Sequence, residues 1–220
     1  NISGNLIKNH SKKVINFGIS GSGPLDQYAI LKEYMPTQKN SKKILWFFSA
    51  DTDLNDLINE INSQSFILYL NNLNYSQNLK LKQYQIDESL RNNIQIELEK
   101  KFANNAKKNF IIFKHIKLFL IRSLFKPEPK IPSEFNKVLR MTRDLAVSNN
   151  STLYFVYIPN LTRYFDMKFI NYDDEIKKIV TDLGIPYLNL DEEVYSKQKN
   201  PRDLFPLDSI GHPNIKGYEI

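Results

Sequence analysis

A chain of 220 residues is long enough to bury a sizeable core, and it fits one α/β domain that carries an insertion. It contains no cysteine, which excludes a disulfide framework, a thiolate metal site and a cysteine nucleophile. The net charge of +6 reflects lysines spread along the chain, and no aromatic-basic motif of the RNA-binding kind accompanies them. We therefore expect a solvated basic surface and no nucleic-acid partner.

The stretch from Val14 to Tyr34 predicts a strand, a glycine turn and a helix in succession. Apolar residues at 14, 15 and 17 predict a short buried strand, and three of the chain's seven glycines follow within residues 18–23. Pro24 suits the first turn of the helix that comes next. Such a unit aims backbone N–H groups at an anion or a developing oxyanion. The alternative is a turn that needs glycine for its backbone angles and binds nothing.

Three later apolar runs predict further strands, at 44–48, 153–158 and 187–190. The run at 44–48 is apolar on both faces, as is typical of parallel strands covered by helices, and the acids and capping residues of 49–57 predict a helix directly after it. Helices are also predicted at 133–149 and 173–183. Four strands separated by helices predict a parallel sheet with its functional residues at the carboxyl ends of the strands. The glycine turn, the Asp51–Asp53 turn and Asn160 all fall there.

Residues 64–131 interrupt this alternation, and we interpret them as a variable, mainly helical insertion. Residues 66–70 fit a helix end or a stray strand, and 87–108 predict a charged helix. The segment 110–125 is the most apolar of the chain, but it is too short and too charged to span a bilayer. A helix lying on a membrane surface or on a partner is one interpretation of it, and packing within its own fold is favoured. No signal peptide or membrane span is visible elsewhere.

One histidine stands in a setting that suggests chemistry. His212 lies in a loop before a predicted terminal helix, four residues after Asp208. A histidine oriented by an aspartate is the usual general-base pair for activating a serine hydroxyl. A surface histidine in a capping loop is the alternative, and the pair alone does not decide between them.

Three stretches taken in order resemble one family. VINFGISGSGPLDQYAILKEY, ILWFFSADTDLNDL and LFPLDSIGHPNIKGY are similar to the second, third and last conserved blocks of the SGNH (GDSL-type) hydrolases. LYFVYIPNLTRYF and GIPYLNLDEEV resemble later strands of that family. The resemblance covers the core of residues 1–220 and implies a three-layer α/β/α flavodoxin-like domain that acts on esters, including O-acyl groups of glycans, without a metal or organic cofactor. It also implies that Gly21 is a backbone oxyanion donor, His212 the base and Asp208 its orienting partner.

The chain departs from the family pattern in three places. The Gly-Asp-Ser block that carries the nucleophile has no counterpart, so we expect it upstream of Asn1 and expect this chain alone to be inert. Thr52 stands where the family has an asparagine that completes the oxyanion hole, with Asn55 as a less favoured substitute. The spacing from Asp208 to His212 is one residue longer than the family's.

Two other functions compete with the esterase. An α/β-hydrolase would use Ser20 or Ser22 as its nucleophile, because GISGS is close to the GxSxG motif. A degenerate, non-catalytic glycan-binding module would explain Thr52. The sequence leaves the identity of the ester, the oligomeric state and the compartment open.

Overall fold

The computed structural model describes residues 14–35, 42–50, 52–104, 130–165, 169–205 and 213–219, with the backbone alone at 99–104 and 218–219. Contacts divide the chain into two compact units. Unit 1 comprises Asn1–Tyr75 and Ile131–Ile220, and unit 2 comprises Ser76–Lys130. The fold is α/β, as the sequence predicts.

Unit 1 is built on a parallel sheet. Its described strands are β1 (Lys43–Ser49), β2 (Thr152–Ile158) and β3 (Tyr187–Asn189), in the order β1-β2-β3. Trp46 pairs with Phe155, and Phe155 pairs in turn with Tyr187. These strands confirm three of the four that the apolar runs predict.

The helices of unit 1 alternate with the strands. They are α2 (Pro24–Tyr34), α3 (Asp53–Ile61), α4 (Gln64–Asn71), α7 (Ser133–Ser148), α8 (Asp173–Asp182), α9 (Leu190–Glu193) and α10 (Ile215–Glu219), with short 3-10 turns η2 (Leu161–Phe165), η3 (Tyr195–Lys197) and η4 (Pro201–Leu204). Residues 66–70 are therefore helical. Because α4 packs on α2 and α3, the division between the units falls at residue 76 and not at 64.

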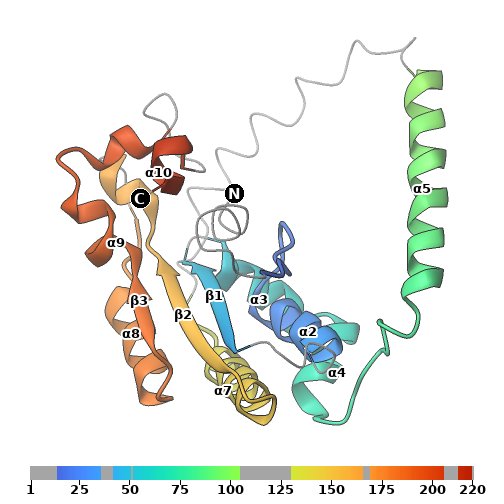
Figure 1. Ribbon diagram of the computed structural model, residues 1–220, viewed down its shortest axis with the longest axis horizontal. Coiled ribbons are helices and arrows are strands. Elements are labelled where there is room, and N and C mark those ends of the chain that lie inside the picture. The colour runs from blue at the N-terminus through green and yellow to red at the C-terminus, as the bar shows by residue number, and fades with distance from the viewer. Residues whose placement is uncertain are drawn as a thin grey trace. The chain divides into compact units, whose positions relative to one another are not determined.

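One face of the sheet packs against helices. Phe48 and Phe155 point to this face, and the Phe48 ring lies 5.0 Å from that of Phe135 in α7. Tyr157 also points there and donates a hydrogen bond to Asp173 at the start of α8 (2.8 Å). Figure 1 shows α7 and α8 behind the strands, with α2 to the side of β1 that is away from β2.

The opposite face of the sheet is more exposed. Leu45 and Leu188 point to it and are 46% and 42% exposed. A three-layer fold requires helices on both faces, and the helices packed along the described strands, α7 and α8, share one face. The flavodoxin-like arrangement with a second helical layer therefore stays a prediction.

The strand predicted at residues 14–17 is wrong. Residues 14–19 form no strand and pair with no described strand, and Ile15 and Ile19 are 54% and 63% exposed. Phe17 stacks on Tyr34 of α2, with ring centroids 6.1 Å apart. An apolar run becomes a strand only where a neighbouring strand accepts its backbone hydrogen bonds, and no described strand does so here.

Unit 2 contains one long described helix, α5 (Gln83–Asn104), which confirms the charged helix predicted from residue 87. Tyr84, Leu90 and Ile94 on it are 79%, 54% and 58% exposed. The apolar segment 110–125 lies outside the described residues. No described helix is long and apolar enough to cross a membrane.

Candidate functional site

The glycine turn before α2 has an exposed, unusual backbone. Gly21 adopts φ +78°, a left-handed conformation that favours glycine, and the Ser22 amide closes the turn on the Ile19 carbonyl (3.3 Å). Gly21 itself is exposed, and its amide makes no hydrogen bond to another described residue. It is therefore free to donate to a ligand atom.

The start of α2, in contrast, is already occupied by a carboxylate from the same chain. Glu60 of α3 accepts hydrogen bonds from the amides of Gly23 (2.7 Å) and Leu25 (2.9 Å). A Cβ atom added at Gly23 would lie 2.8 Å from the Glu60 oxygens and 2.7 Å from the Asp56 Cβ, so this position requires glycine. The helix N-terminus thus binds Glu60 where the sequence suggested an external anion.

Burial raises the pKa of Glu60 to about 7, even though the Leu25 and Gly23 amides favour the charged form. No described cation lies close enough to form an ion pair with this carboxylate. Glu60 therefore titrates near neutrality.

The turn after β1 is organised by a second buried carboxylate. Asp53 accepts a hydrogen bond from the Ser49 amide (3.2 Å) and another from the Thr52 hydroxyl (3.0 Å). Burial raises the pKa of Asp53 to about 6, against the lowering effect of these two hydrogen bonds. Because a hydroxyl carries one proton, Thr52 is not free to donate to an oxyanion while Asp53 accepts that proton.

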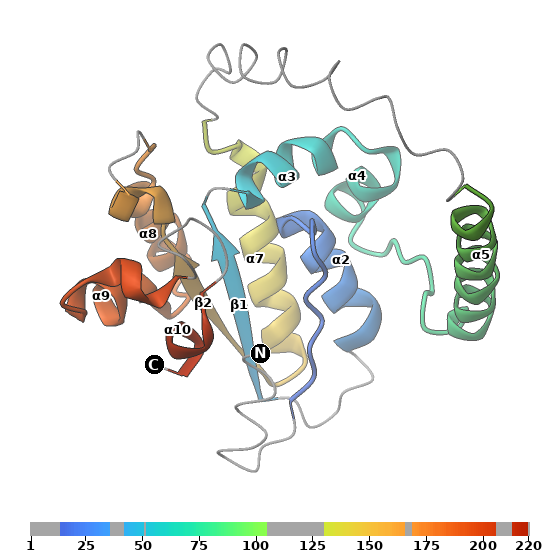
Figure 2. The same cartoon turned by 90° about the horizontal axis from the view of Figure 1, so that it is seen from above.

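Gln27 joins the two turns. Its amide donates to the Ser22 carbonyl (2.9 Å), and its side chain also hydrogen-bonds Asp53. Figure 2 shows the start of α2 beside α3, in agreement with the Glu60 contacts. The structure thus brings the Gly21 turn and the Thr52 turn together at the carboxyl end of β1.

His212 and Asp208 lie outside the described residues, so the structure gives no distance from either of them to Gly21. The described residues that follow them are anchored. The Asn214 amide donates to the Leu204 carbonyl (2.8 Å), and α10 packs on η4. Tyr195, Leu204 and Phe205 form the small apolar cluster beneath this segment.

A cluster of charges that the sequence did not single out lies at the carboxyl ends of β2 and β3. Arg163 of η2 binds Asp173 (2.9 Å) and Asp191 (3.0 Å), and its Nε donates to the Asn160 carbonyl (3.1 Å). Tyr157 also donates to Asp173. We call Arg163, Asp173 and Asp191 the arginine clamp.

The arginine clamp is a closed network. Tyr164 and Ser196 donate to Asp191, and Tyr157 donates to Asp173. Burial opposes the charge of Asp191, but these donors and the guanidinium hold the pKa of that carboxyl below its usual range. The clamp joins η2, α8 and α9, and its acceptors are taken by the chain itself, which indicates a structural role. Asn160, which the sequence did single out, accepts a hydrogen bond from the Thr162 amide (2.9 Å) and shapes the same loop.

The alternative nucleophiles in the glycine turn differ in access. Ser20 is exposed, whereas Ser22 is 8% exposed and its Oγ donates to Asp26 (2.7 Å). The chain's three histidines all lie outside the described residues, so no described imidazole faces either serine.

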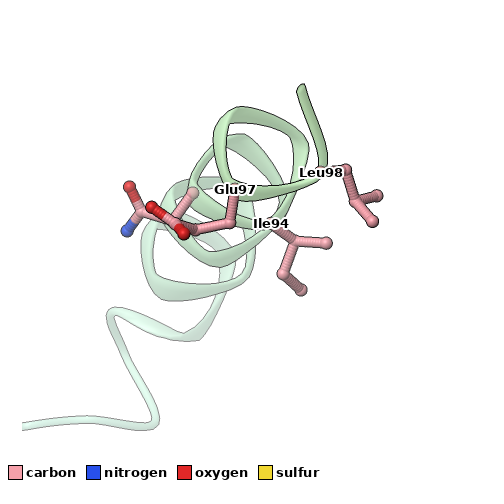
Figure 3. Close-up of a pocket in the computed structure, with 4 residues that line it drawn as sticks. Ile94, Glu97 and Leu98 are labelled. Atoms are coloured by element: carbon pink, nitrogen blue, oxygen red, sulfur yellow. The ribbon is translucent and has the colours of Figure 1, made fainter. Parts of the chain in front are cut away.

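The described residues contain no group of three histidine, aspartate or glutamate side chains placed to hold a metal ion. In unit 2, α5 has a shallow hollow lined by Asn93, Ile94, Glu97 and Leu98 (Figure 3). All four belong to one helix, so the hollow is a feature of that helix's surface.

No protein-family model, curated protein or solved structure matches this chain.

Proposed function

We propose that this chain forms the core of a serine ester hydrolase of the SGNH type, with a three-layer flavodoxin-like fold. One observation supports the proposal most: an exposed Gly21 amide in a left-handed turn lies beside the Thr52 turn at the carboxyl end of β1. A backbone N–H at that edge suits the developing oxyanion of acyl transfer. The proposed substrate is a small ester or an O-acyl group of a glycan.

In the proposed reaction, the serine hydroxyl of a Gly-Asp-Ser block attacks the ester carbonyl carbon while His212 accepts the serine proton. The carbonyl oxygen becomes an oxyanion that accepts a hydrogen bond from Gly21. His212 then gives the proton to the departing alcohol, and water or a sugar hydroxyl takes the acyl group from the serine in the second half. Asp208 orients His212. No metal or organic cofactor takes part in these steps.

Thr52 and Asp53 act together in this proposal. When Asp53 is ionised, it accepts the Thr52 proton, and Gly21 is the remaining donor. When Asp53 is protonated, its hydroxyl can donate to Thr52 Oγ1, and the threonine proton then turns to the oxyanion. This exchange is open to Thr52 only where Asp53 is protonated, below about pH 6, so at higher pH Gly21 is the remaining donor.

A fluorophosphonate probe tests the identity of the nucleophile, because such probes label activated serines. The 220-residue chain should not react. A polypeptide that joins these residues to a Gly-Asp-Ser block should be labelled at the serine of that block, and labelling should disappear in a His212→Ala variant. Labelling at Ser20 or Ser22 would instead support the α/β-hydrolase.

A non-catalytic glycan-binding module is the second candidate, favoured by the hydrogen bond that directs the Thr52 proton to Asp53. In that case the probe labels no serine of the natural polypeptide. Saturable binding of acetylated oligosaccharides in calorimetry, without acetate release, would identify this function.

A further inference from the structure

The long helix of unit 2, α5, has an exposed apolar stripe. Leu90, Ile94 and Leu98 recur every four residues, which sets them on one side of the helix, and they are 54%, 58% and 43% exposed. Figure 3 shows Ile94 and Leu98 pointing to the same side of α5. The described residues of unit 2 include no second helix or strand to cover this stripe. Because helices in proteins gain most of their stability from packing one face, the stripe indicates a binding surface.

The shallow hollow of α5 lies on this face. Ile94 and Leu98 line it together with Asn93 and Glu97, so it lies between two neighbouring rows of residues that are each spaced by four. The groove between two such rows receives side chains when helices pack against each other. The hollow therefore suits an apolar side chain of a second helix.

The charges of α5 are arranged symmetrically about Ile94, with opposite signs. Residues of opposite charge lie equally far before and after Ile94 in three sets: Arg91 with Glu97, Glu88 with Lys100, and Asp87 with Lys101. The remaining charged residue of the helix, Glu99, corresponds to Ser89, and Leu90 corresponds to Leu98. Two copies of such a helix attract each other when they are antiparallel and centred on Ile94. Two parallel copies in register would instead place each charge against its own like.

This symmetry identifies the kind of partner. In an interface between two copies related by a two-fold axis, every contact occurs twice, so the surface must be complementary to itself. An unrelated protein partner does not require that property. A helix that lies on a membrane is rich in lysine and arginine on its polar face, whereas α5 contains more acidic than basic residues. The observations therefore favour a second copy of this chain.

We propose that α5 binds α5 of a second copy of this chain, as an antiparallel pair whose two-fold axis passes beside Ile94. The two Ile94 side chains meet at the axis, and Leu90 of each copy lies at the same level along the helices as Leu98 of the other. Arg91 lies in the same way at the level of Glu97 of the second copy. Burial of the apolar stripe provides affinity, and the charges determine direction and register. This inference does not depend on the proposed hydrolase activity.

Self-association of the 220-residue chain tests the proposal in analytical ultracentrifugation. We expect a reversible equilibrium between monomer and dimer, which Ile94→Asp should weaken at least a hundredfold, because it brings two carboxylates together among apolar side chains. Ile96→Asp is the matched control, since Ile96 is 47% exposed and lies about 200° from Ile94 around the helix. It should change the dissociation constant less than threefold. A chain that stays monomeric at millimolar concentration, or a dimer that Ile94→Asp leaves intact, would overturn the proposal.

Charge reversal tests the direction of the pair. Arg91→Glu places an acid at the level of Glu97 of the second copy, and Glu97→Arg places a base at the level of Arg91. Each variant alone should self-associate about tenfold more weakly than the wild type. An equimolar mixture of the two should form a mixed dimer with wild-type affinity, because every altered charge then meets its opposite. Repulsion within one helix cannot produce this recovery, so a mixture that associates no better than either variant would overturn the antiparallel register.

Single cysteines locate the axis, and they decide the matter if circular dichroism shows that Ile94→Asp has lost helix. The chain contains no cysteine, so an introduced one is unique. Ile94→Cys should form a disulfide between the two copies under mild oxidation. Leu90→Cys should not, because its two copies lie about 12 Å apart along the helices, beyond the reach of a disulfide. Crosslinking through Leu90→Cys, or none through Ile94→Cys, would overturn the proposed pair.

Discussion

The carboxylates near the end of β1 and those near the ends of β2 and β3 are held in different ways. Beside β1, Asp53 and Glu60 are bound by backbone amides and neutral side chains, and burial raises the pKa of each. Beside β2 and β3, Asp191 shares a guanidinium with Asp173, and its pKa is lowered. Asp191 therefore keeps its charge to lower pH than an ordinary aspartate, whereas Asp53 and Glu60 change protonation near neutrality. The arginine clamp thus has a structural role, whereas the candidate site contains carboxylates that titrate near neutrality.

Removing Arg163 should have the largest effect on stability. Arg163→Ala leaves two half-buried carboxylates without their cation, and we expect a loss of about 3–5 kcal/mol in the free energy of unfolding. Urea denaturation measures it. The matched control is Lys178→Ala, whose exposed ion pair with Asp182 should contribute less than about 0.5 kcal/mol. Equal effects of the two variants would show that the clamp is not structural.

Replacing Gly23 by alanine should destabilise the protein more than replacing Gly21 by alanine. Gly23→Ala forces a Cβ against Asp56 and Glu60, so we expect a loss of about 2–3 kcal/mol. Gly21→Ala meets open space but keeps a left-handed backbone, which costs about 1–2 kcal/mol. Thermal unfolding of both variants compares them. The reverse order would mean that Glu60 does not hold the start of α2.

Stability should depend on pH in the range set by Asp53 and Glu60. Their folded-state pKa values, about 6 and about 7, lie above the ordinary 3.8 and 4.5, so the folded chain binds protons that the unfolded chain has released. The free energy of unfolding should therefore fall as pH rises from about 4 to 7, by about 2 kcal/mol after solvent screening. In the double variant Asp53→Asn, Glu60→Gln, the free energy of unfolding should change little between about pH 4 and 7. An unchanged slope in that double variant would assign the titration to other groups.

The smallest expected effect is a gain in the free energy of unfolding. Asp53→Asn imitates the protonated acid: its carbonyl accepts from Ser49 and its amide donates to Thr52. At pH 8 we expect a stabilisation of about 1 kcal/mol, because a buried charge is removed and the hydrogen bonds remain. Asp56→Asn on the same helix is the control and should change little. Destabilisation by Asp53→Asn would show that the charge itself organises the turn.

The sequence predicted most of the fold because the apolar runs at 44–48, 153–158 and 187–190 pair with one another within the described residues. Residues 14–17 have the same pattern and form no strand, since a strand needs a neighbour that local sequence does not supply. The glycine turn and the Thr52 turn are candidate sites that their glycines and acids predict, and their role stays a prediction.

Glu60 and the arginine clamp could not be recognised in the same way. Glu60 lies 37 residues from Gly23, and Arg163 is 28 residues from Asp191. Each is one charged residue among others in a stretch whose local pattern predicts an ordinary helix or loop. Their partners are brought together by the packing of α2 on α3 and by the ends of β2 and β3, which no local pattern encodes.

The most direct test of the central claim is the turnover of an acetyl ester by the natural polypeptide that contains these residues, with and without His212. His212→Ala should lower kcat about a thousandfold or more, because a serine nucleophile without its base loses most of its reactivity. The free energy of unfolding should stay unchanged, and Asp208→Ala should lower kcat less. In the wild type, kcat should fall as pH drops through the histidine pKa, about 6.5 when unperturbed. A wild-type rate in His212→Ala would contradict the account.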